Sequence, residues 1–554
     1  MATPQPVGRS SDLDFRDRPR LFAHAEARTF DVVVVGAGIT GAGVARSAAA
    51  RGLTVALVEA RDISSGTSSR SSKLIHGGIR YLAEGAFSLV RETARERQIL
   101  RSIAPHLTRK ASMVLPTRSF AEKAKYRAGV ALFEKLGNVP REERHRMLNR
   151  NELAEIEPVA ATPGATGGVQ YYEFVTDDAR LTLANVRSAV SDGAVVLTYA
   201  PVVEILEEGG RAVGVRCRSR LPGESLEAII RGRVIVNAAG PWVDALRAFE
   251  SPSNDARLTL TKGIHLVVPR GRLPIENVVV FEAADRRPVF AIPRDGVTYL
   301  GTTDTFHPEA EYWPAITQEE VDYLFAAASR TFTAEPLEPD DVVSSWTGVR
   351  PLVAQPGKRP SEISRRDEIW TGPTGVLSIA GGKLTAYRAM AERVVDAACR
   401  TLDHGADEGD GAHEPLVGGD CDPTALLAER HPGSSAWRRL VDLYGSEAAD
   451  LDDAGGDVRA EVRHAVLREG ALRLEDYWVR RSVRALFDPD AGLSTLQTAA
   501  IEMTALLGWS SARREEEVDG CLARFAHDNA LFARAASQAR AEPQKGTSHE
   551  LQHG

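Results

Sequence analysis

A glycine-rich turn near the start of the sequence has the residue types and spacing that bind a dinucleotide. The motif is Gly36-Ala37-Gly38-Ile39-Thr40-Gly41, between an apolar run at 30–35 and an Ala-rich stretch at 39–50. In a strand–turn–helix context the three glycines permit the tight turn, the approach of a pyrophosphate and close helix packing, while the helix N-terminus faces the phosphates. Glu59 ends the next apolar run, 54–59, where an acid is expected to bond the ribose hydroxyls.

Three later segments favour FAD over NAD as the dinucleotide. A Ser-rich loop at 64–72 could wrap a second phosphate and a flavin, and the run 234–240 is a strand that ends in small residues beside a bulky cofactor. At 379–383 the strand–glycine–helix pattern recurs, so a second helix N-terminus could face a flavin carbonyl. Each segment alone is equally explained by turn chemistry, and only their combination favours FAD. The expected cofactor contacts beyond the glycine motif and Glu59 are Thr67, Ser68, Ser72, Lys73, Leu74, Gly77, Gly78, Val203, Ala239, Gly240, Trp242, Gly381, Gly382, Lys383, Leu384 and Thr385.

Length and composition are those of a globular protein with more than one domain. The 554 residues exceed one compact core and indicate two or three domains. A net charge of −8, from 68 basic and 76 acidic residues, argues against nucleic acid as a partner. The cysteines lack metal-ligand spacing, so we expect reduced thiols and no metal site; they are Cys217, Cys399, Cys421 and Cys521.

The elements that must position these residues can be outlined from hydrophobic periodicity. A charged helix is expected at 83–104, and no apolar run approaches the roughly 20 residues of a membrane-spanning helix. The middle of the chain is richer in strands, and the segment beyond about 420 has helical periodicity. Strand candidates are 202–205, 212–217 and 228–236, followed by a hairpin of 289–292 and 297–301 around Pro293-Arg294-Asp295-Gly296.

Further motifs resemble the family of FAD-dependent glycerol-3-phosphate dehydrogenases. The most specific is Ser71-Ser72-Lys73-Leu74-Ile75-His76-Gly77-Gly78-Ile79-Arg80-Tyr81-Leu82. Thr347-Gly348-Val349-Arg350-Pro351-Leu352 and Gly381-Gly382-Lys383-Leu384-Thr385-Ala386-Tyr387-Arg388 are similar to two more family motifs. Lys262-Gly263-Ile264-His265 and Gly301-Thr302-Thr303-Asp304-Thr305 add weaker support. The matches follow the family's order over about residues 30–390, with one departure at Ala386, where family members often have Thr.

The resemblance implies an α/β fold with three parts. A Rossmann-like FAD-binding domain of the D-amino-acid-oxidase type carries an inserted β-rich substrate domain and is followed by an α-helical C-terminal domain. The polar N-terminal residues lack the apolar core of a signal peptide, so they are interpreted as an arm. The expected division is a flexible N-terminal arm at 1–28, the FAD-binding domain at 29–400 with its substrate part at roughly 118–180 and 260–345, a linker at 403–420, the helical domain at 421–540 and a disordered tail at 541–554.

The resemblance also implies a reaction and a place in the cell. The family oxidises sn-glycerol 3-phosphate to dihydroxyacetone phosphate and passes the electrons through FAD to a membrane quinone. The protein is therefore expected in the cytoplasm, bound peripherally to the inner face of the cell membrane. The oligomeric state is left open, a homodimer included.

Oxidation of a secondary alcohol by a flavin needs a group that takes the hydroxyl proton. A neutral histidine suits this role because its ordinary pKa lies near working pH. His265 and His76 are the two candidates, and both stand within family-like motifs. A cation that polarises the hydroxyl is the alternative, with Arg350 and Lys383 as the candidates. Arg80 and Lys383 each lie beside a glycine pair expected to contact the flavin, so each can reach both ligands.

A phosphate dianion calls for arginine, with its forked donors, or for lysine. Arg350 is the strongest candidate because Gly348 and Pro351 fix the turn around it. The assignment of Arg365 to phosphate binding rests mainly on the resemblance, and the sequence does not distinguish it from its neighbour Arg366. The full expected substrate-binding set is Arg80, Tyr81, Arg350, Arg365, Lys383 and Thr385.

A segment at 118–137 is the candidate for peripheral membrane contact. It places Lys123, Lys125 and Arg127 among aromatic and aliphatic residues in a helical pattern. Such a basic amphipathic helix can lie in the headgroup layer of an anionic membrane. An ordinary helix packed on the core explains the same pattern equally well.

Three other functions remain open on the sequence alone. An oxidase that passes electrons to oxygen would share the scaffold, and the sequence discriminates it poorly. An amine or amino-acid oxidase would bind a carboxylate and would not need the arginines. A non-catalytic nucleotide-binding or RNA-modifying flavoprotein is disfavoured because no strongly basic face or aromatic cluster is evident.

Overall fold

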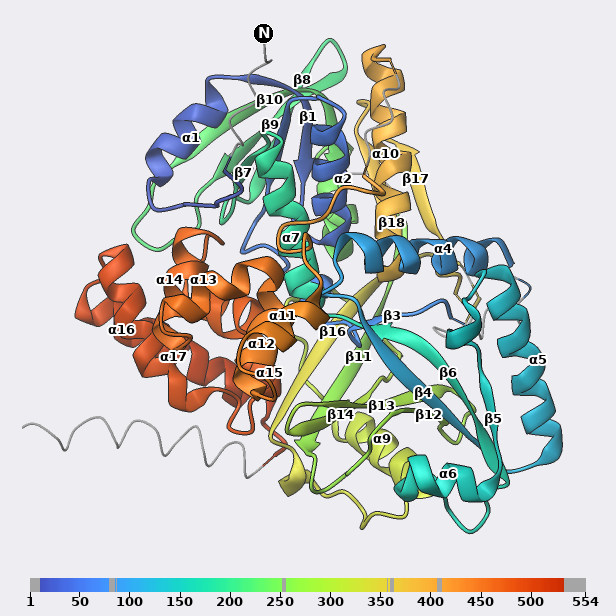
Figure 1. Cartoon of the computed structure of the whole chain (residues 1–554). Coiled ribbons are helices and arrows are strands. Elements are labelled where there is room, and N and C mark those ends of the chain that lie inside the picture. Colours follow the sequence, from blue (N-terminus) through green and yellow to red (C-terminus); the bar gives the residue numbers. More distant parts are fainter. Residues whose placement is uncertain are drawn as a thin grey trace, which may run out of the picture.

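The computed structural model describes residues 10–78, 85, 87–251, 256–355, 357–358, 363–405 and 411–532. Two β-sheets and a C-terminal group of helices make up the molecule (Figure 1). The first sheet occupies the upper part of this view and the second the lower right, with the C-terminal helices packed beside both.

The first sheet is the one that the glycine motif predicts. Its strand order is β17-β18-β10-β1-β2-β7, in which β1 pairs in parallel with both β10 and β2. Val32 and Val34 of β1 pack towards the helices on one face, while Val33 and Val35 face the opposite core. The strands are β1 Thr29–Val35, β2 Val55–Val58, β7 Val195–Leu197, β10 Glu227–Asn237, β17 Asp367–Thr371 and β18 Leu377–Gly381, and the covering helices are α2 Ile39–Ala50, α7 Asp178–Ser191 and α10 Tyr387–Leu402.

A β-meander extends this sheet, and it confirms three strand predictions. β8, β9 and β10 pair antiparallel in sequence order, over Val202–Glu208, Arg211–Arg218 and Glu227–Asn237. The predicted hairpin is confirmed as well, since β13 Pro288–Arg294 pairs with β14 Val297–Gly301 in the second sheet.

The second sheet is mostly antiparallel and has ten strands among the described residues. Its order is β15-β11-β14-β13-β12-β4-β6-β3, with β16 beside β11 and β5 beside β6. This sheet includes more of the chain than the expected ranges 118–180 and 260–345. Strands β3 and β4 lie before residue 118, and β16 extends beyond residue 345. The remaining strands are β3 Leu74–Ile75, β4 Arg109–Thr117, β5 Arg146–Leu148, β6 Gly167–Val175, β11 Leu258–Pro269, β12 Val278–Glu282, β15 Thr305–Phe306 and β16 Ser344–Val353, and the helices beside them are α4 Phe87–Ile103, α5 Phe120–Leu136, α6 Arg150–Ile156 and α9 Gln318–Thr331.

The C-terminal helices share a hydrophobic core with the second sheet. Phe487 packs against Trp346 of β16, with ring centroids 5.8 Å apart. Asp62, which follows β2, forms buried ion pairs with Arg480 and Arg481 and so ties this part to the first sheet. The helices are α11 Pro423–Glu429, α12 Ser435–Tyr444, α13 Ala448–Asp453, α14 Val458–Leu467, α15 Arg484–Phe487, α16 Leu496–Leu507 and α17 Ser511–Asp528.

The expectation of a flexible N-terminal arm is wrong for residues 10–28. Residues 18–26 form helix α1 (Arg18–Glu26), which buries Phe22, and Leu13 and Phe15 are buried before it. The Leu13 amide donates to the carbonyl of Arg468, 3.1 Å away. The apolar residues were too sparse to show a periodicity, although Asp17-Arg18-Pro19 is a helix-start signal.

The expected linker also packs closely where it is described, since Leu416 is buried and Arg46 donates to the Glu414 carbonyl. Residues 1–9 and the expected tail at 541–554 lie outside the described residues. Across the described part of the chain, every helix is too short or too polar to cross a bilayer.

Candidate active site

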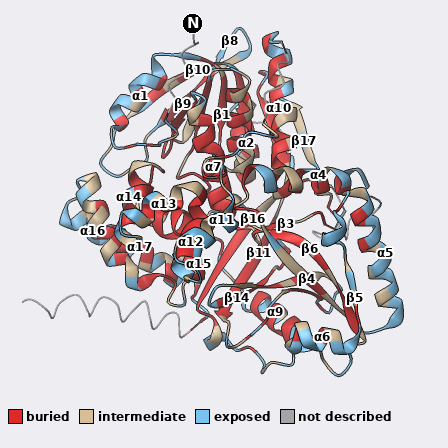
Figure 2. Ribbon diagram, in the orientation of Figure 1, coloured by how far each residue is buried: buried red, intermediate tan, exposed pale blue. Residues whose placement is uncertain are grey.

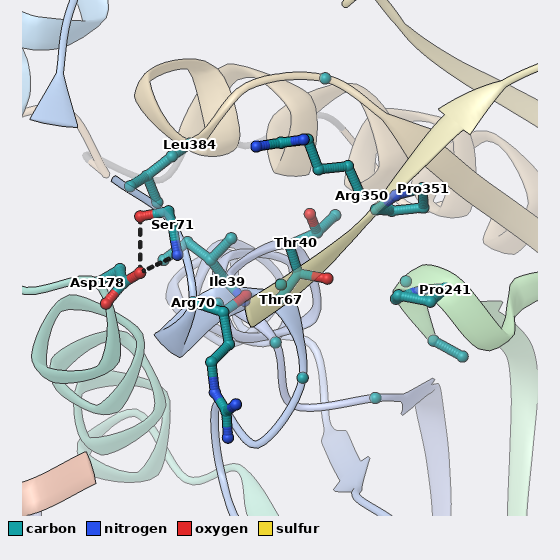
Figure 3. Close-up of a pocket in the computed structure, with 18 of the residues that line it drawn as sticks. Ile39, Thr40, Thr67, Arg70, Ser71, Asp178, Pro241, Arg350, Pro351 and Leu384 are labelled. Carbon is teal, nitrogen blue, oxygen red and sulfur yellow. Dashed lines mark hydrogen bonds between the residues drawn. The ribbon is translucent and has the colours of Figure 1, made fainter. Parts of the chain in front are cut away.

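A cavity of about 650 Å³ lies at the carboxyl ends of β1 and β2 and extends to the second sheet. Figure 3 shows side chains that surround it, with Ile39 and Thr40 of α2, Thr67 of the Ser-rich loop and Arg350 of β16 drawn from different parts of the chain. Open α/β sheets bind their ligands at this edge.

The glycine turn fits the pyrophosphate of a dinucleotide. Gly36 has a φ of +105°, and a Cβ there would lie 2.6 Å from the Ala238 carbonyl oxygen. A Cβ on Gly41 would lie 1.8 Å from the Gly36 oxygen, so this glycine serves helix packing. Gly38 is the N-cap of α2 and supplies no capping side chain. The Ile39 amide at this N-terminus donates to the Ser68 hydroxyl at 2.8 Å, so the Ser-rich loop lies beside the helix end that is expected to face a phosphate.

Glu59 joins the glycine turn to the second strand. Its carboxylate accepts hydrogen bonds from the backbone amides of Ala37 at 2.7 Å and Arg61 at 2.8 Å. Burial raises the pKa of Glu59, although these amides act in the opposite direction. The side chain lines the cavity, at the position expected for the ribose.

At the other end of the cavity, Gly381 and Gly382 follow β18 with φ values of +79° and +83°. A Cβ on Gly382 would lie 2.3 Å from the sulfur of Met390. These glycines therefore let the chain turn into α10 beside the cavity, where Lys383, Leu384 and Thr385 complete the lining.

Most predicted cofactor contacts line the cavity, and five do not. Val203 is 38% exposed, because successive residues of a strand point to opposite faces and its neighbour Val202 is the one that lines the cavity. Lys73 is fully buried and bonds to Asp178 instead. Gly41, Gly77 and Gly78 are likewise absent from the lining.

Asp178 organises the Ser-rich loop and was missed in the sequence. It begins α7, and its carboxylate accepts from the Ser71 hydroxyl at 2.6 Å and the Ser71 amide at 2.9 Å. The same carboxylate is ion-paired with Lys73. Asp177-Asp178 after an apolar strand is a helix-start signal, but nothing local connects it to a loop more than 100 residues earlier.

His265 is held as a neutral imidazole. Its ring stacks on Trp346, the residue opposite it on β16, with centroids 4.6 Å apart. Nε2 lies 2.8 Å from the Ser72 hydroxyl, whereas Nδ1 has no hydrogen-bond partner among the described residues. Burial and the charges of Arg350 and Lys73 hold the pKa of His265 well below its ordinary value.

His76 lines the same cavity from the other side of the Ser-rich loop. Its backbone amide donates to the Thr385 hydroxyl at 3.1 Å, and its ring meets the edge of Phe290. The structure thus brings both histidine candidates to the cavity.

An arginine cluster closes the end of the cavity near His265. Both Arg350 Nη1 and Arg365 Nη2 lie 3.1 Å from the carboxylate of Asp304, and Arg287 Nη2 lies 3.2 Å from it. Three cations against one carboxylate leave a net charge of about +2, which matches a phosphate dianion. Burial acts to raise the pKa of Asp304, but the arginines outweigh it and lower the pKa.

Packing against glycine sets the position of Arg350. Gly263 lies on β11 beside it, and a Cβ there would lie 2.0 Å from Arg350 Nη2. Arg350 Nη2 also donates to the Thr302 hydroxyl at 2.7 Å. This explains why a family-like motif at 262–265 contains glycine.

The other expected substrate contacts have different outcomes. Arg365 rather than Arg366 reaches the cavity, since Arg366 donates to Ser88 at 3.0 Å. Arg80 and Tyr81 lie outside the described residues. Arg287 and Asp304 also line the cavity and form an ion pair with each other, and neither was predicted as a site residue. A charged residue in a loop between strands gives no local sign of what it faces.

A cavity of this kind is what a dinucleotide-dependent oxidoreductase with the D-amino-acid-oxidase fold requires, and the fold and the site together assign the protein to that class. A family model described as FAD dependent oxidoreductase matches residues 31–388. A second, described as the C-terminal domain of alpha-glycerophosphate oxidase, matches residues 410–514.

Comparisons with individual proteins identify the family within this class of oxidoreductases. The aerobic glycerol-3-phosphate dehydrogenase of Staphylococcus saprophyticus is 37% identical over 516 residues, which cover 88% of this chain and 92% of that protein. The Staphylococcus aureus protein of the same name is 36% identical over 533 residues, covering 90% and 95%. The solved structure of the glycerol-3-phosphate dehydrogenase from Bacillus halodurans complexed with FAD aligns with a TM-score of 0.78 at 33% identity, over 93% of this chain and 98% of that one. The chain belongs to the family of FAD-dependent glycerol-3-phosphate dehydrogenases, and its cofactor is FAD.

The fold predicted from the sequence is confirmed by these matches. A glycine oxidase from Geobacillus kaustophilus shares the fold at 18% identity and a TM-score of 0.51. Fold alone therefore does not choose between an alcohol and an amine as the substrate.

Proposed function

We propose that the enzyme oxidises sn-glycerol 3-phosphate to dihydroxyacetone phosphate and passes the electrons from FAD to a membrane quinone. The observation that carries the substrate assignment is the Arg287, Arg350 and Arg365 cluster around Asp304. An amine or amino-acid oxidase would need one cation for a carboxylate, whereas this site presents a surplus of two positive charges. The names of the relatives support the same substrate.

The residues divide the work of the reaction between them. The arginine cluster binds the phosphate and so places the secondary hydroxyl near His76 or the neutral His265. The base takes the hydroxyl proton, and Lys383 contributes a positive charge that favours the developing alkoxide. FAD, when bound, accepts the hydride from the carbon.

The cofactor would be held along the glycine-lined wall of the cavity. The N-terminus of α2 would face the pyrophosphate, Glu59 the ribose, and the turn at Gly381 and Gly382 the flavin. Ser72 joins the FAD site to the substrate site, because it lies in the cofactor loop and its hydroxyl contacts the candidate base His265.

The outer face of α5 supports peripheral membrane contact. Phe120 is 85% exposed, and Lys125, Arg127 and Leu132 are exposed on the same helix, which lies at the edge of the molecule (Figure 2). The inner face packs on the protein, because Val130 and Phe133 are buried and Lys123 donates to the Leu148 carbonyl. Only the outer half of the expected amphipathic helix is therefore available to lipid. Through this face, we propose, the protein binds the inner face of the cell membrane from the cytoplasm.

A pair of assays tests the reaction and its electron acceptor. Holoenzyme with glycerol 3-phosphate and a soluble quinone analogue, without oxygen, should form dihydroxyacetone phosphate. The same mixture in air without the quinone should form little peroxide. Fast peroxide formation would identify an oxidase, and turnover of glycine instead would identify an amine oxidase.

A further inference from the structure

The loop at 307–317, here called the strap, reaches from the second sheet to the cofactor cavity. Its Tyr312 lines the cavity and stacks on Trp242, with ring centroids 4.1 Å apart. The guanidinium carbon of Arg61 lies 4.0 Å from the centroid of the same ring. Two groups this close to one ring must lie on opposite faces, so Tyr312 is held between Trp242 and Arg61.

This sandwich lies at the adenosine end of the cavity. The Arg61 amide donates to the carboxylate of Glu59, which marks the ribose position of the dinucleotide. Burial and the charge of Glu59 also raise the pKa of Tyr312, which therefore stays a neutral phenol beside that carboxylate. His265 and Arg350 mark the opposite, flavin end.

The next residue of the strap, Trp313, is fixed by two other arginines. The guanidinium carbons of Arg70 and Arg524 lie 3.4 Å and 3.2 Å from the centroid of its ring. By the same geometry they occupy opposite faces. Arg70 belongs to the Ser-rich cofactor loop, whereas Arg524 belongs to α17 of the C-terminal helices.

The Trp313 ring packs directly on the buried guanidinium group of Arg70. Arg70 is 4% exposed, and the one hydrogen bond that its guanidinium group makes to the described residues runs from Nη1 to the Thr347 carbonyl at 3.5 Å. Burial and the nearby Arg524 hold the pKa of Arg70 well below its ordinary value. Arg524 is anchored by two hydrogen bonds to Asp528, at 2.6 Å and 2.9 Å. Without the ring, Arg70 would lose its cation–π contact and the cofactor loop would lose this support.

We propose that the strap is an FAD-retaining element, in which Tyr312 closes the adenosine end of the cavity and Trp313 is clamped between Arg70 of the cofactor loop and Arg524 of the C-terminal helices. The clamp gives the C-terminal helices a role in cofactor binding, although none of their described residues, up to 532, lines the cavity. In this proposal the glycine motif and Glu59 bind the dinucleotide on the side of the first sheet, and the strap holds it on the opposite side of the cavity.

Release of FAD from the full-length holoenzyme tests this proposal without any substrate. After dilution, the rise in flavin fluorescence gives the rate constant of release. Tyr312→Ala, Trp313→Ala and Arg524→Ala should each raise it by about tenfold, the size expected for losing a buried stacking or cation–π contact. Trp313→Phe keeps a ring face and should release FAD more slowly than Trp313→Ala. Arg514→Ala, earlier on α17, is the matched control and should behave as the wild type.

Release within twofold of the wild type in Tyr312→Ala and Trp313→Ala would overturn the proposal. If Trp313→Ala does not fold, wild-type release in both Tyr312→Ala and Arg524→Ala would overturn it equally. Melting temperatures provide a second readout, because a ligand that binds only the folded state raises the melting temperature. The variants should reduce the increase that FAD produces, with little change in the FAD-free protein. An equal fall in both forms would instead assign the strap a purely structural role.

Discussion

At the scale of single residues, the phosphate site depends on Asp304, whose carboxylate bonds three guanidinium groups. Its lowered pKa keeps it ionised, so it can hold Arg287, Arg350 and Arg365 close together against their mutual repulsion. The cluster is thereby arranged before the substrate arrives, and this preorganisation reduces the cost of binding a phosphate.

Loss of one arginine from this cluster should weaken substrate binding more than turnover. Arg365→Ala should raise KM for glycerol 3-phosphate by about 10- to 100-fold, because a hydrogen bond between charged groups contributes about 1.5–3 kcal/mol. Steady-state kinetics measures this, with Arg366→Ala as the control. An unchanged KM in Arg365→Ala would remove that residue from the phosphate site.

The neutral state of His265 predicts an unusual pH profile. Its pKa is lowered in the folded protein, so the ring stays unprotonated, and able to accept a proton, as the pH falls through 6.5, the ordinary value. The kcat at saturating substrate should therefore show no His265-dependent loss near pH 6.5, and His265→Asn should lower kcat by about 10²- to 10⁴-fold. An acid limb near pH 6.5 that His265→Asn abolishes would contradict the assignment. A loss confined to His76→Asn would make His76 the base.

At the scale of elements, the turn between β1 and α2 is specified locally, and this explains why it could be predicted. Gly36 needs both a left-handed backbone and the absence of a side chain. The Ser71–Asp178 and Arg287–Asp304 contacts, by contrast, join distant segments, and no local pattern reveals them. The position of Val202 was missed by one residue, because strand phase depends on which face the rest of the fold covers.

Substitution of Gly36 tests the cofactor turn. Gly36→Ala should abolish FAD retention, since its Cβ would meet the Ala238 carbonyl and the backbone would be strained. Gly52→Ala is a matched control, with a φ of +78° but open space around the Cβ, so it should cost about 1 kcal/mol of stability and keep FAD. The ratio of flavin absorbance to protein absorbance after purification measures the outcome. Equal FAD content in the two variants would contradict this role of Gly36.

Charge reversal tests the outer face of α5. The double variant Lys125→Glu and Arg127→Glu should lower binding to anionic phospholipid vesicles by at least tenfold, since each basic residue near the surface contributes about 1 kcal/mol. Arg438→Glu, exposed on α12, is the control for net charge. Vesicle co-sedimentation gives the affinity, and unchanged binding of the double variant would place the membrane contact elsewhere.

At the scale of the whole molecule, the C-terminal helices are joined to the first sheet by buried charge. Asp62 accepts from Arg480 at 2.5 Å and from Arg481 at 2.5 Å and 2.7 Å, and all three side chains are buried. Such pairs are costly to break, because the remaining charges stay buried without compensation. Together with the strap, they make the helical domain and the cofactor domain interdependent.

The variant Asp62→Asn should destabilise the protein by about 3–5 kcal/mol. The expected result is a melting temperature several degrees below that of the wild type, with one transition rather than two. Differential scanning calorimetry distinguishes these outcomes. Separate melting of a C-terminal unit in the wild type would show that the two parts are not interdependent.

The absorbance of the flavin under anaerobic conditions tests the central claim most directly. Glycerol 3-phosphate added to holoenzyme without oxygen should bleach the band near 450 nm (roughly the absorption of oxidised protein-bound flavin, whose electronics the protein tunes). The flavin takes the hydride from the substrate and stays reduced, because no electron acceptor is present to reoxidise it. Glycerol, which lacks the phosphate, and glycine, an amine, should leave the band unchanged at the same concentration. A band that glycine bleaches and glycerol 3-phosphate does not would contradict the account, and the arginine cluster would then need another ligand.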